Sequence, residues 1–369
     1  MKKVVYISSS LFPSTKANSV QVIKMCEELG KSFNLTLYGI DNRQGLNSDF
    51  NVFDHFGCEE NLNIILSKKK RAIFYSFSIF FKLFFQENYI YYSRNFLVAC
   101  LLTFIGKKNV VFEAHVDPKH QPFYNKIFTP FLKFSNIKIV AISQKLKEIF
   151  SDYYNFSLDK ILVAHDAADE KKFQMERNII LEGNRIQVGY IGSLYKGRGL
   201  ELVCELAKMN TNIDFNIVGG TEKEISELKI SYGYSNVIFH GYVPYSEVQL
   251  NIEKQHILLA PYQLELQISG GSAINTMQYM SPLKIFEYMA CKRPIILSRL
   301  KVLFEVLDDN SACFADPKDI NEWQAKLEKL VNDNIYYNKI IDNSYSKFIK
   351  YYTVKYRVEL IINFIENAK

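Results

Sequence analysis

The chain has 369 residues, of which 48% are hydrophobic, and a formal net charge of +6 at pH 7. This length exceeds what one hydrophobic core usually organises, so we expect two compact domains of roughly 150 to 190 residues each. The hydrophobic content excludes a largely disordered chain. The charge is modest and spread along the sequence, and no recognition motif accompanies it, which excludes a nucleic-acid-binding protein.

The six cysteines are widely scattered and never form a CxxC pair. The sequence therefore predicts neither a zinc site nor a disulfide framework, and it indicates a reducing, cytoplasmic location. Three serines at residues 8–10 interrupt the apolar start too early for a signal peptide, so residues 1–12 are interpreted as containing a first strand. No window reaches the ~18 to 20 apolar residues that a spanning helix requires.

Residues 68–85 contain four basic residues followed by an aromatic run that only Lys82 interrupts. Two interpretations stay open for this segment. It is either a buried helix with a solvated basic cap, or a peripheral contact with anionic lipid at the inner face of the cytoplasmic membrane. In the second case each basic residue contributes on the order of 1 kcal/mol.

Strands and helices alternate through the first half of the chain. A strand at 4–7, a helix at 19–29 and a strand at 35–40 predict a right-handed crossover and a parallel sheet. Further strands are expected at 89–92, 110–113, 137–141 and 161–164, with a helix at 144–150. The chain becomes polar between residues 169 and 185, where we expect the junction between the domains.

The alternation restarts after this junction and predicts a second doubly wound domain. We expect strands at 187–191, 214–218, 237–239, 257–260 and 294–298, and helices at 200–209, 222–232, 282–291 and 320–332. The predicted division is therefore a domain at 1–170, a linker at 171–185 and a domain at 186–345. Residues 346–369 end in a long amphipathic helix, at 354–368, that we expect to pack back on the first domain.

Three segments carry residues that packing does not require. The first, at residues 8–18, contains Lys16 and follows the first strand, and ligands bind outside the carboxyl ends of parallel strands. It lacks a GxGxxG pattern, which argues against a dinucleotide-dependent oxidoreductase. An ordinary polar loop stays the alternative interpretation.

The second segment runs from Gly192 and Ser193 to Gly199 and joins a strand to a helix. It approaches the GxxxxGK[ST] pattern, but Arg198 and Gly199 replace the lysine and the hydroxyl residue, which excludes a P-loop NTPase. Its glycines and the following helix start still favour an anion site, where Arg198 can donate two hydrogen bonds to phosphate. The alternative is a turn with solvent-facing basic residues.

The third segment covers residues 270–290 and leads into a helix. Ser281 is predicted as the N-cap and Pro282 as the first helical residue. Three backbone amides of this segment are expected to take part in holding a diphosphate, and Gly271, Ser281 and Leu283 are binding candidates here.

Lys284 and Glu287 fall one turn apart on one face of this helix. The helix dipole disfavours a lysine in the first turn, and such an inconsistency often signals function. We therefore expect Lys284 to bind the diphosphate with the amides, and Glu287 to accept hydrogen bonds from ribose hydroxyls. An exposed Lys-Glu pair is the alternative interpretation.

Together these residues resemble the retaining glycosyltransferases of family 4, which have the fold called GT-B. The resemblance runs through residues 16–29, 112–115, 140–143, 163–169 and 189–206, and is densest over SPLKIFEYMACKRPIILS at 281–298. It implies an α/β chain with two Rossmann-like, doubly wound parallel-sheet domains that face a central cleft.

The resemblance also implies an activity: transfer of a hexose, with retention of anomeric configuration and without a metal or cofactor, from a nucleoside-diphosphate sugar. The donor is expected to be UDP-linked. The acceptor is expected to be a glycan or lipid-linked glycan in bacterial capsule, lipopolysaccharide or other surface polysaccharide synthesis. Oligomeric state is left open.

Site residues follow from the same resemblance. It assigns Arg198 and Lys284 to the donor phosphates and Glu287 to the ribose. His115 resembles the first-domain histidine that approaches the transferred sugar, and the loop around Lys16 is expected to supply amides near the diphosphate.

Two positions depart from the family pattern. Tyr279 stands where many members have the first of two glutamates, and Ser193 where an arginine is common. These departures keep open a non-catalytic partner that binds a nucleotide or glycan and regulates another transferase. A nucleotide-sugar 2-epimerase, which uses the same double Rossmann layout, is the other alternative.

Overall fold

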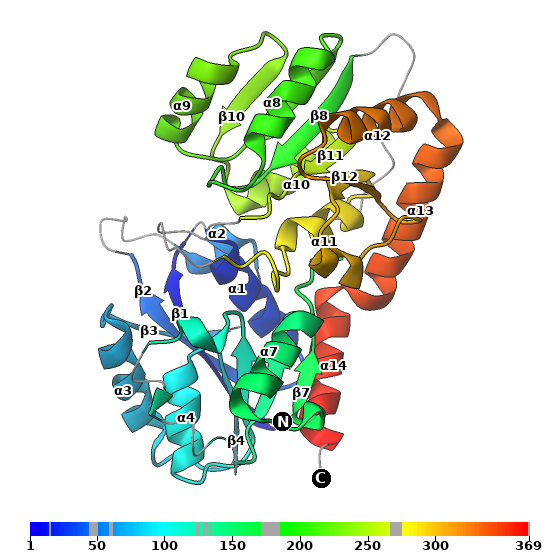
Figure 1. Ribbon diagram of the computed structural model, residues 1–369. Helices are drawn as coiled ribbons and strands as arrows, with labels where there is room; N and C mark the ends of the chain where they lie inside the picture. Colours follow the sequence, from blue (N-terminus) through cyan, green and yellow to red (C-terminus); the bar gives the residue numbers. More distant parts are fainter. Residues whose placement is uncertain are drawn as a thin grey trace. The chain divides into compact units, whose positions relative to one another are not determined.

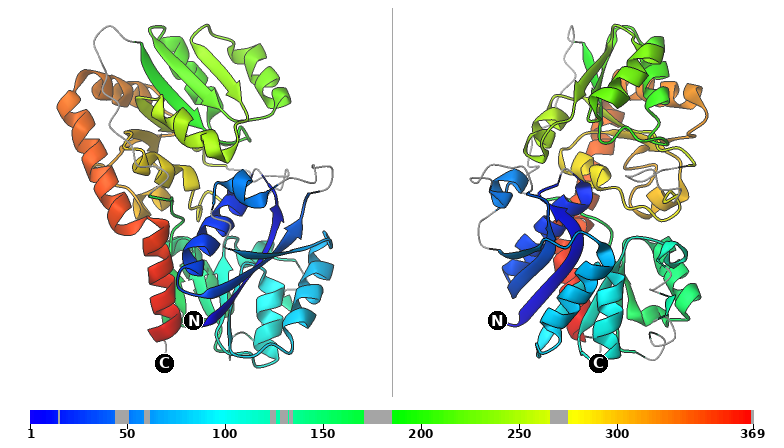
Figure 2. Two further views of the ribbon diagram at one scale, coloured as in Figure 1. Left: turned by 180° about the vertical axis from the view of Figure 1, so that it is seen from behind. Right: turned by 90° about the vertical axis from the view of Figure 1, so that its left-hand side faces the viewer.

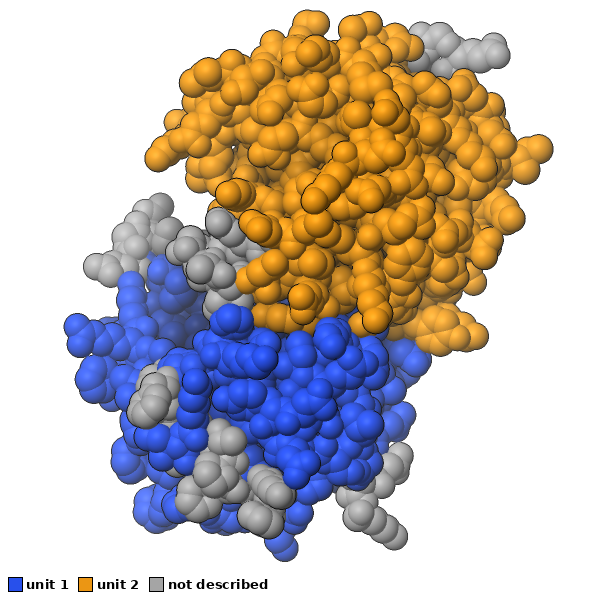
Figure 3. All heavy atoms as spheres, viewed as in Figure 1, with its two compact units in different colours: residues 1–166, 354–369 blue, residues 167–353 orange. Residues whose placement is uncertain are grey.

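The computed structural model describes residues 1–14, 16–43, 51–58, 62–122, 126–127, 132, 135–170, 185–265 and 275–367. The chain divides into a first unit, Met1–Asp166 with Val354–Lys369, and a second unit, Ala167–Thr353 (Figure 3). The expected linker lies outside the described residues except for Arg185. Residues 346–351 continue a helix of the second unit, and the helix of the first unit begins at Val354.

The described part of the first unit contains a seven-stranded sheet in the order β3-β2-β1-β4-β5-β6-β7, with every neighbouring pair parallel (Figure 1). Its strands are β1 (Lys3–Phe12), β2 (Asn34–Asp41), β3 (Asn63–Ser67), β4 (Tyr89–Ser93), β5 (Val110–Ala114), β6 (Lys138–Ala141) and β7 (Ile161–Val163). The central strands are almost wholly buried because helices cover both faces of a parallel sheet.

The helices of the first unit form two layers. Strands β2 and β3 are added on one side of β1, and strands β4 to β7 are added in order on its other side. Because each crossover is right-handed, the connecting helices of the two halves cover opposite faces of the sheet. Helix α1 packs against α14 and α3 against α4 (Figures 1 and 2). The described helices are α1 (Ala17–Gly30), α2 (Val52–Phe56), α3 (Ala72–Leu83), α4 (Phe96–Phe104), α7 (Gln144–Tyr154) and α14 (Val354–Asn367), with short 3-10 turns at Pro118–His120 and Leu158–Lys160.

The described part of the second unit has a six-stranded parallel sheet in the order β10-β9-β8-β11-β12-β13. Its strands are β8 (Ile186–Ile191), β9 (Ile213–Val218), β10 (Val237–Gly241), β11 (Ile257–Ala260), β12 (Ile295–Ser298) and β13 (Cys313–Ala315). Its helices are α8 (Leu200–Met209), α9 (Glu222–Tyr232), α10 (Tyr245–Glu253), α11 (Leu283–Ala290), α12 (Ile320–Asn332) and α13 (Asn334–Tyr351), with a 3-10 turn at Lys301–Glu305. One apolar cluster lies on each face of this sheet.

Both sheets share one topology. In each, the strand order reverses beside the first strand, between β1 and β4 in the first unit and between β8 and β11 in the second. The predicted fold class, two doubly wound parallel-sheet domains, is confirmed. Ligands of such folds bind at the carboxyl ends of the strands where the order reverses, which directs attention to the loops after β8 and β11.

The predicted loop at residues 8–18 is partly wrong, because β1 continues to Phe12. The hydroxyls of Ser8 and Ser10 lie 2.7 Å apart, and Tyr75 donates a hydrogen bond of 2.7 Å to the Ser8 carbonyl. These bonds satisfy the buried polar groups of Ser8 and Ser10, so β1 can continue past an irregularity in its register between Ile7 and Leu11. The connection to α1 is reduced to residues 13–16.

Within the described residues, every helix is too short or too polar to span a lipid bilayer.

Candidate functional site

The loop after β8 closes tightly on the end of β11. Gly192 has a φ of 151°, and Gly199, the N-cap of α8, has a φ of 75°. A Cβ atom at Gly199 would lie 1.9 Å from the carbonyl oxygen of Pro261. Only glycine allows this left-handed conformation together with so close an approach, and the loop is thereby held at the reversal of the strand order.

Lys284 extends from the first turn of α11 to this loop. Its Nζ atom lies 3.7 Å from the ring centroid of Tyr190 and 2.8 Å from the place of a Cβ at Gly192. The ammonium group is shielded from solvent and has no hydrogen-bond partner among the described residues. A buried cation is costly unless it is paired, and the ring face compensates only part of that cost.

Arg198 approaches the same place from the loop. The ring centroid of Tyr262 lies 5.5 Å from the guanidinium carbon of Arg198 and also 5.5 Å from Nζ of Lys284. The Nε of Arg198 is likewise buried with no partner among the described residues. Two basic side chains therefore converge around one tyrosine ring, with donors left for a ligand.

The electrostatics of this pair favour an anion. Burial, followed by the nearby Arg198 guanidinium, holds the pKa of Lys284 well below its usual range, and Glu287 opposes the shift only in part. Burial raises the pKa of Tyr262 to about 12 against the effect of Arg198. A ligand with two or more negative charges would restore the charged lysine and supply the missing acceptors.

The other predicted residues of the second unit lie around α11 and the loop. Glu287 follows Lys284 by one turn but is only 6% exposed, so the exposed Lys-Glu pair is excluded. Burial and the Glu287 carboxylate raise the pKa of Tyr245. Ser193 accepts a hydrogen bond of 2.6 Å at its carbonyl from the Tyr190 hydroxyl. Tyr279 is buried.

The predicted helix start needs a correction. The N-cap of α11 is Pro282, with φ −78° and ψ 116°, and Leu283 is the first helical residue. Ser281 is buried and precedes the N-cap by one position. The prediction was wrong because a proline tolerates the extended N-cap conformation as well as the first helical position. Gly271 lies outside the described residues.

In the first unit, His115 follows β5 and contacts a buried carboxylate. Its Nε2 lies 2.7 Å from Oε1 of Glu113, whose side chain is fully buried. Burial alone would raise the pKa of Glu113, but Arg357, Arg94 and His115 outweigh it and hold that pKa well below its usual range. The carboxylate is therefore charged, which directs a proton to Nε2 of His115 and leaves Nδ1 as the acceptor.

Several residues of this cluster were not predicted. Tyr6 and Tyr92 both donate hydrogen bonds to Oε2 of Glu113, and Arg357 comes from α14. Gln21 donates to Asp166, whose pKa is raised by burial. Lys16, by contrast, is exposed and directly precedes α1.

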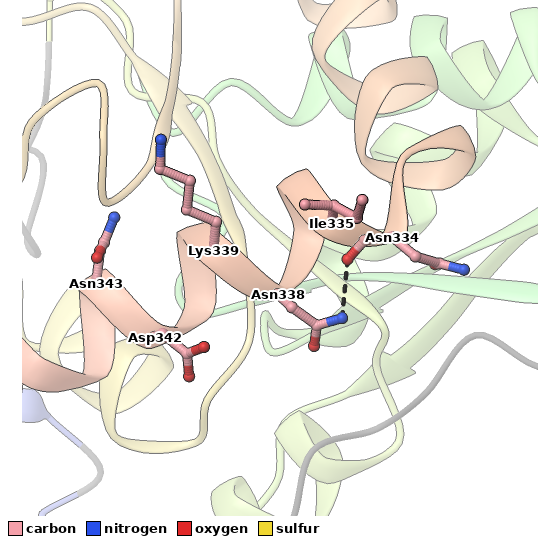
Figure 4. A pocket seen from close by; sticks show the side chains of 6 residues that line it. All are labelled: Asn334, Ile335, Asn338, Lys339, Asp342 and Asn343. Atoms are coloured by element: carbon pink, nitrogen blue, oxygen red, sulfur yellow. Dashed lines mark hydrogen bonds between the residues drawn. The ribbon is translucent and has the colours of Figure 1, made fainter.

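A hollow elsewhere on the second unit holds none of the predicted site residues. It is lined by one face of α13 alone, with Asn338 bonded to the carbonyl of Asn334 (Figure 4). The lining residues are Asn334, Ile335, Asn338, Lys339, Asp342 and Asn343. Within the described ranges, no group of three or more His, Cys, Asp or Glu side chains is arranged to hold a metal ion.

Comparison with known proteins decides the family. Residues 171–347 match the family model described as glycosyl transferases group 1. The second unit therefore belongs to the glycosyl transferases group 1. This confirms the resemblance to glycosyltransferases, while the narrower assignment to family 4 stays a prediction. Among curated protein sequences, none matches significantly.

Solved structures show the fold of the chain as a whole. HepE from Anabaena, solved in complex with UDP and glucose, is 12% identical with a TM-score of 0.73, and all of both chains is covered. Sucrose-phosphate synthase from Thermosynechococcus elongatus is 12% identical with a TM-score of 0.74 over 98% of each chain. The lipopolysaccharide outer core galactosyltransferase WaaB is 15% identical with a TM-score of 0.67, covering 98% of this chain and 99% of its own. The architecture is that of GT-B glycosyltransferases.

Proposed function

We propose that this chain is a retaining glycosyltransferase that binds a nucleoside-diphosphate sugar, UDP-linked, in its second unit. Membership of that unit in the glycosyl transferases group 1 supports the reaction class. The UDP assignment is supported by the similar fold of HepE, which was solved with UDP and with UDP-glucose. The acceptor is proposed to be a glycan or lipid-linked glycan of a bacterial surface polysaccharide.

One observation carries this proposal: the buried Nζ of Lys284 has no hydrogen-bond partner among the described residues and shares the Tyr262 ring with Arg198. Two preorganised basic side chains beside a glycine-rich loop fit a diphosphate in charge and in hydrogen bonding once the ligand restores the charged form of Lys284. The same groups suit the negative charge that develops on the diphosphate as it leaves, so they serve binding and catalysis together.

The proposed reaction is a front-face substitution. The acceptor hydroxyl oxygen forms a bond to the anomeric carbon on the face from which the diphosphate departs, and the bond from that carbon to the phosphate oxygen breaks. The acceptor proton passes to an oxygen of the leaving phosphate. No protein nucleophile and no metal ion take part. Loss of one oxyanion donor typically costs ~2.7 to 4 kcal/mol, or about 100- to 1,000-fold in turnover.

The remaining assignments complete the proposal. Glu287 binds the ribose hydroxyls, His115 contacts the transferred sugar through Nδ1, and backbone amides near Lys16 approach the diphosphate. The protein acts in the cytoplasm. Chelation of divalent metal ions is expected to leave the transfer rate unchanged, and a loss of activity with a chelator would contradict the metal-free mechanism.

Calorimetric titration with UDP, GDP and ADP tests the donor site. Lys284→Met and Arg198→Met should each weaken UDP binding by at least about tenfold, since each removes a charge-assisted bond to phosphate. Lys329→Met is a matched control, because Nζ of Lys329 lies 3.9 Å from the Tyr336 ring centroid without belonging to the site. Wild-type affinity for UDP in both site variants would overturn the assignment.

A transfer assay then separates the proposed activity from its alternatives. Turnover of a UDP-sugar with an acceptor, and its loss in Lys284→Met, is the expected result. Interconversion of UDP-sugars without an acceptor would identify a 2-epimerase. Tight UDP binding without transfer or donor hydrolysis, for all acceptors offered, would identify a nucleotide-binding partner of another transferase.

A further inference from the structure

Helix α3 exposes a row of phenylalanines to solvent. Phe74, Phe77, Phe81 and Phe85 are 56%, 39%, 66% and 87% exposed, and their spacing of three or four residues places them on one side of the helix and its extension. We call these four residues the α3 stripe. Large apolar side chains exposed singly are ordinary, but a contiguous row of them marks an interaction surface.

The core of the first unit does not account for the α3 stripe. The opposite side of the helix supplies the packing, with Tyr75, Ile79 and Leu83 at 0%, 1% and 0% exposure. Helix α3 lies at the outside of the first unit beside α4 (Figures 1 and 2). Helix α3 is therefore apolar on both sides. The interpretation as a buried helix accounts for one side, and the interpretation as a lipid contact accounts for the other.

A cluster of positive charge adjoins the α3 stripe. Lys68, Lys69, Lys70 and Arg71 are all exposed and directly precede the helix. Residues 62–86 contain five basic residues, the fifth being Lys82, and no acidic residue. Basic side chains before a helix are disfavoured by its dipole and by their mutual repulsion, so the stability of α3 does not explain them.

We propose that the α3 stripe and residues 68–71 dock the protein on an anionic lipid surface. The helix would lie in the plane of the interface, with the phenylalanine rings among the upper acyl chains and the lysines and arginine against the headgroup phosphates. Charge complementarity selects lipid over a neutral apolar partner. A spanning orientation is excluded, because 12 helical residues extend about 18 Å and the hydrocarbon core is about 30 Å thick.

This inference deepens the proposed function, since it would bring the transferase to lipid-linked acceptors in the same membrane. The docking proposal rests on the proposed function only in saying why the protein binds the membrane. Lipid binding itself needs neither a donor nor turnover, so the two proposals can fail separately.

Co-sedimentation of the full chain with vesicles tests the docking surface. One set of vesicles contains phosphatidylcholine alone, and the other contains phosphatidylcholine with phosphatidylglycerol. The protein should bind the second set and bind the first much more weakly. The variant Phe74→Ser/Phe81→Ser/Phe85→Ser should reduce the affinity for these vesicles by at least about tenfold. Each replacement of a basic residue at 68–71 by glutamine should reduce that affinity by about fivefold.

Matched controls exist on the second unit. Ile230 and Ile335 are 87% and 85% exposed, so Ile230→Ser/Ile335→Ser removes exposed apolar surface away from the α3 stripe. Replacing the exposed Lys223, Lys254, Lys318 and Lys339 by glutamine removes the same charge from the second unit. Neither control should change vesicle binding. Circular dichroism and the thermal unfolding of every variant report whether the fold is intact, and UDP binding tests the donor site of the second unit separately.

A fluorescence measurement checks the depth of insertion. The natural tryptophan, Trp323, is fully buried, so Phe81→Trp introduces a probe on the α3 stripe whose emission should shift to the blue on adding phosphatidylglycerol vesicles. Absence of wild-type binding to these vesicles, or equal binding by the phenylalanine and control variants, would overturn the proposal. Self-association that the phenylalanine variant abolishes, without lipid binding, would instead assign the α3 stripe to a second copy of the chain.

Discussion

Nη2 of Arg357 lies 3.0 Å from Oε1 of Glu113, joining helix α14 near the end of the chain to the carboxyl end of β5. The two side chains are 2% and 0% exposed. Arg357 also donates through Nε to the carbonyl of His165. One arginine therefore holds α14 on the first unit and neutralises the carboxylate that orients His115, which links the stability of this unit to the proposed contact with the transferred sugar.

Replacement of Arg357 should destabilise the first unit strongly. Arg357→Met leaves the Glu113 charge buried with Arg94 at 4.0 Å as its nearest remaining guanidinium, and breaking a buried pair in this way costs about 3 to 5 kcal/mol. Hydrogen exchange of peptides from β5 and α14 should show the loss of protection. Arg299→Met is the control, because Arg299 is 40% exposed in its pairs with Asp309 and Glu322 and its loss should cost about 1 kcal/mol or less.

A second substitution identifies the cause of that destabilisation. Glu113→Gln in the Arg357→Met background removes the uncompensated charge and should recover part of the lost stability. If the double variant were as unstable as the sum of the two single variants, the buried ion pair would not be the origin of the effect, and packing of the arginine stem would account for it instead.

Long periodic runs made most of the fold predictable. Helices α8, α9 and α12 begin and end at the predicted residues, because each has an amphipathic pattern and a polar or glycine boundary. Helix α13 was not predicted, although its buried Tyr337, Ile340, Ile341, Ser344 and Phe348 follow helical spacing. Its abundant asparagine and tyrosine, which favour helices weakly, concealed that pattern.

The candidate site was predictable only in its charged residues. Lys284 and Arg198 stand in segments whose sequences are unusual for packing alone. Tyr190 and Tyr262 look like ordinary residues at strand ends, and they contact these basic side chains only because β8 and β11 are neighbours in the sheet. The contact between Glu113 and Arg357 joins residues 244 positions apart. An arginine within an amphipathic helix reads as part of its polar face, so nothing in the sequence indicates its burial.

Lys284→Met should stabilise the ligand-free protein while weakening UDP binding. An unfolded chain keeps its lysine protons up to about pH 10.4, whereas burial and Arg198 make folded Lys284 release its proton at lower pH. Between the folded and the unfolded pKa of Lys284, the unfolded state binds more protons than the folded state. The free energy of unfolding of the wild type therefore rises with pH through that window. The methionine variant should lack this rise and be more stable near neutral pH by about 1 to 3 kcal/mol. Denaturant titrations across pH check both statements, and a variant less stable than the wild type would show that Lys284 is not an unpaired buried cation.

UDP binding should be accompanied by proton uptake. The diphosphate raises the lowered pKa of Lys284, so at any pH where the ligand-free lysine has released its proton, binding draws a proton from the buffer. Calorimetric titrations in buffers of different ionisation enthalpy measure this number as the slope of binding enthalpy against buffer enthalpy. Lys329→Met should keep the uptake. A zero slope for the wild type would mean that Lys284 is already protonated before the ligand binds.

Gly199→Ala should be far more destabilising than Gly106→Ala, although both glycines have positive φ angles, 75° and 81°. At Gly106 a Cβ atom would meet nothing within 4 Å, so the substitution carries only the cost of the left-handed conformation, about 1 to 2 kcal/mol. At Gly199 the added carbon would lie 1.9 Å from the Pro261 carbonyl oxygen, which forces the loop after β8 away from β11. The free energy of unfolding should therefore fall by at least about 2 kcal/mol more than in Gly106→Ala. Because the movement also displaces Arg198 from Tyr262, UDP affinity should fall as well. Hydrogen exchange of the loop peptides and UDP titration of both variants check this, and equal losses at the two glycines would contradict the close packing of the loop on Pro261.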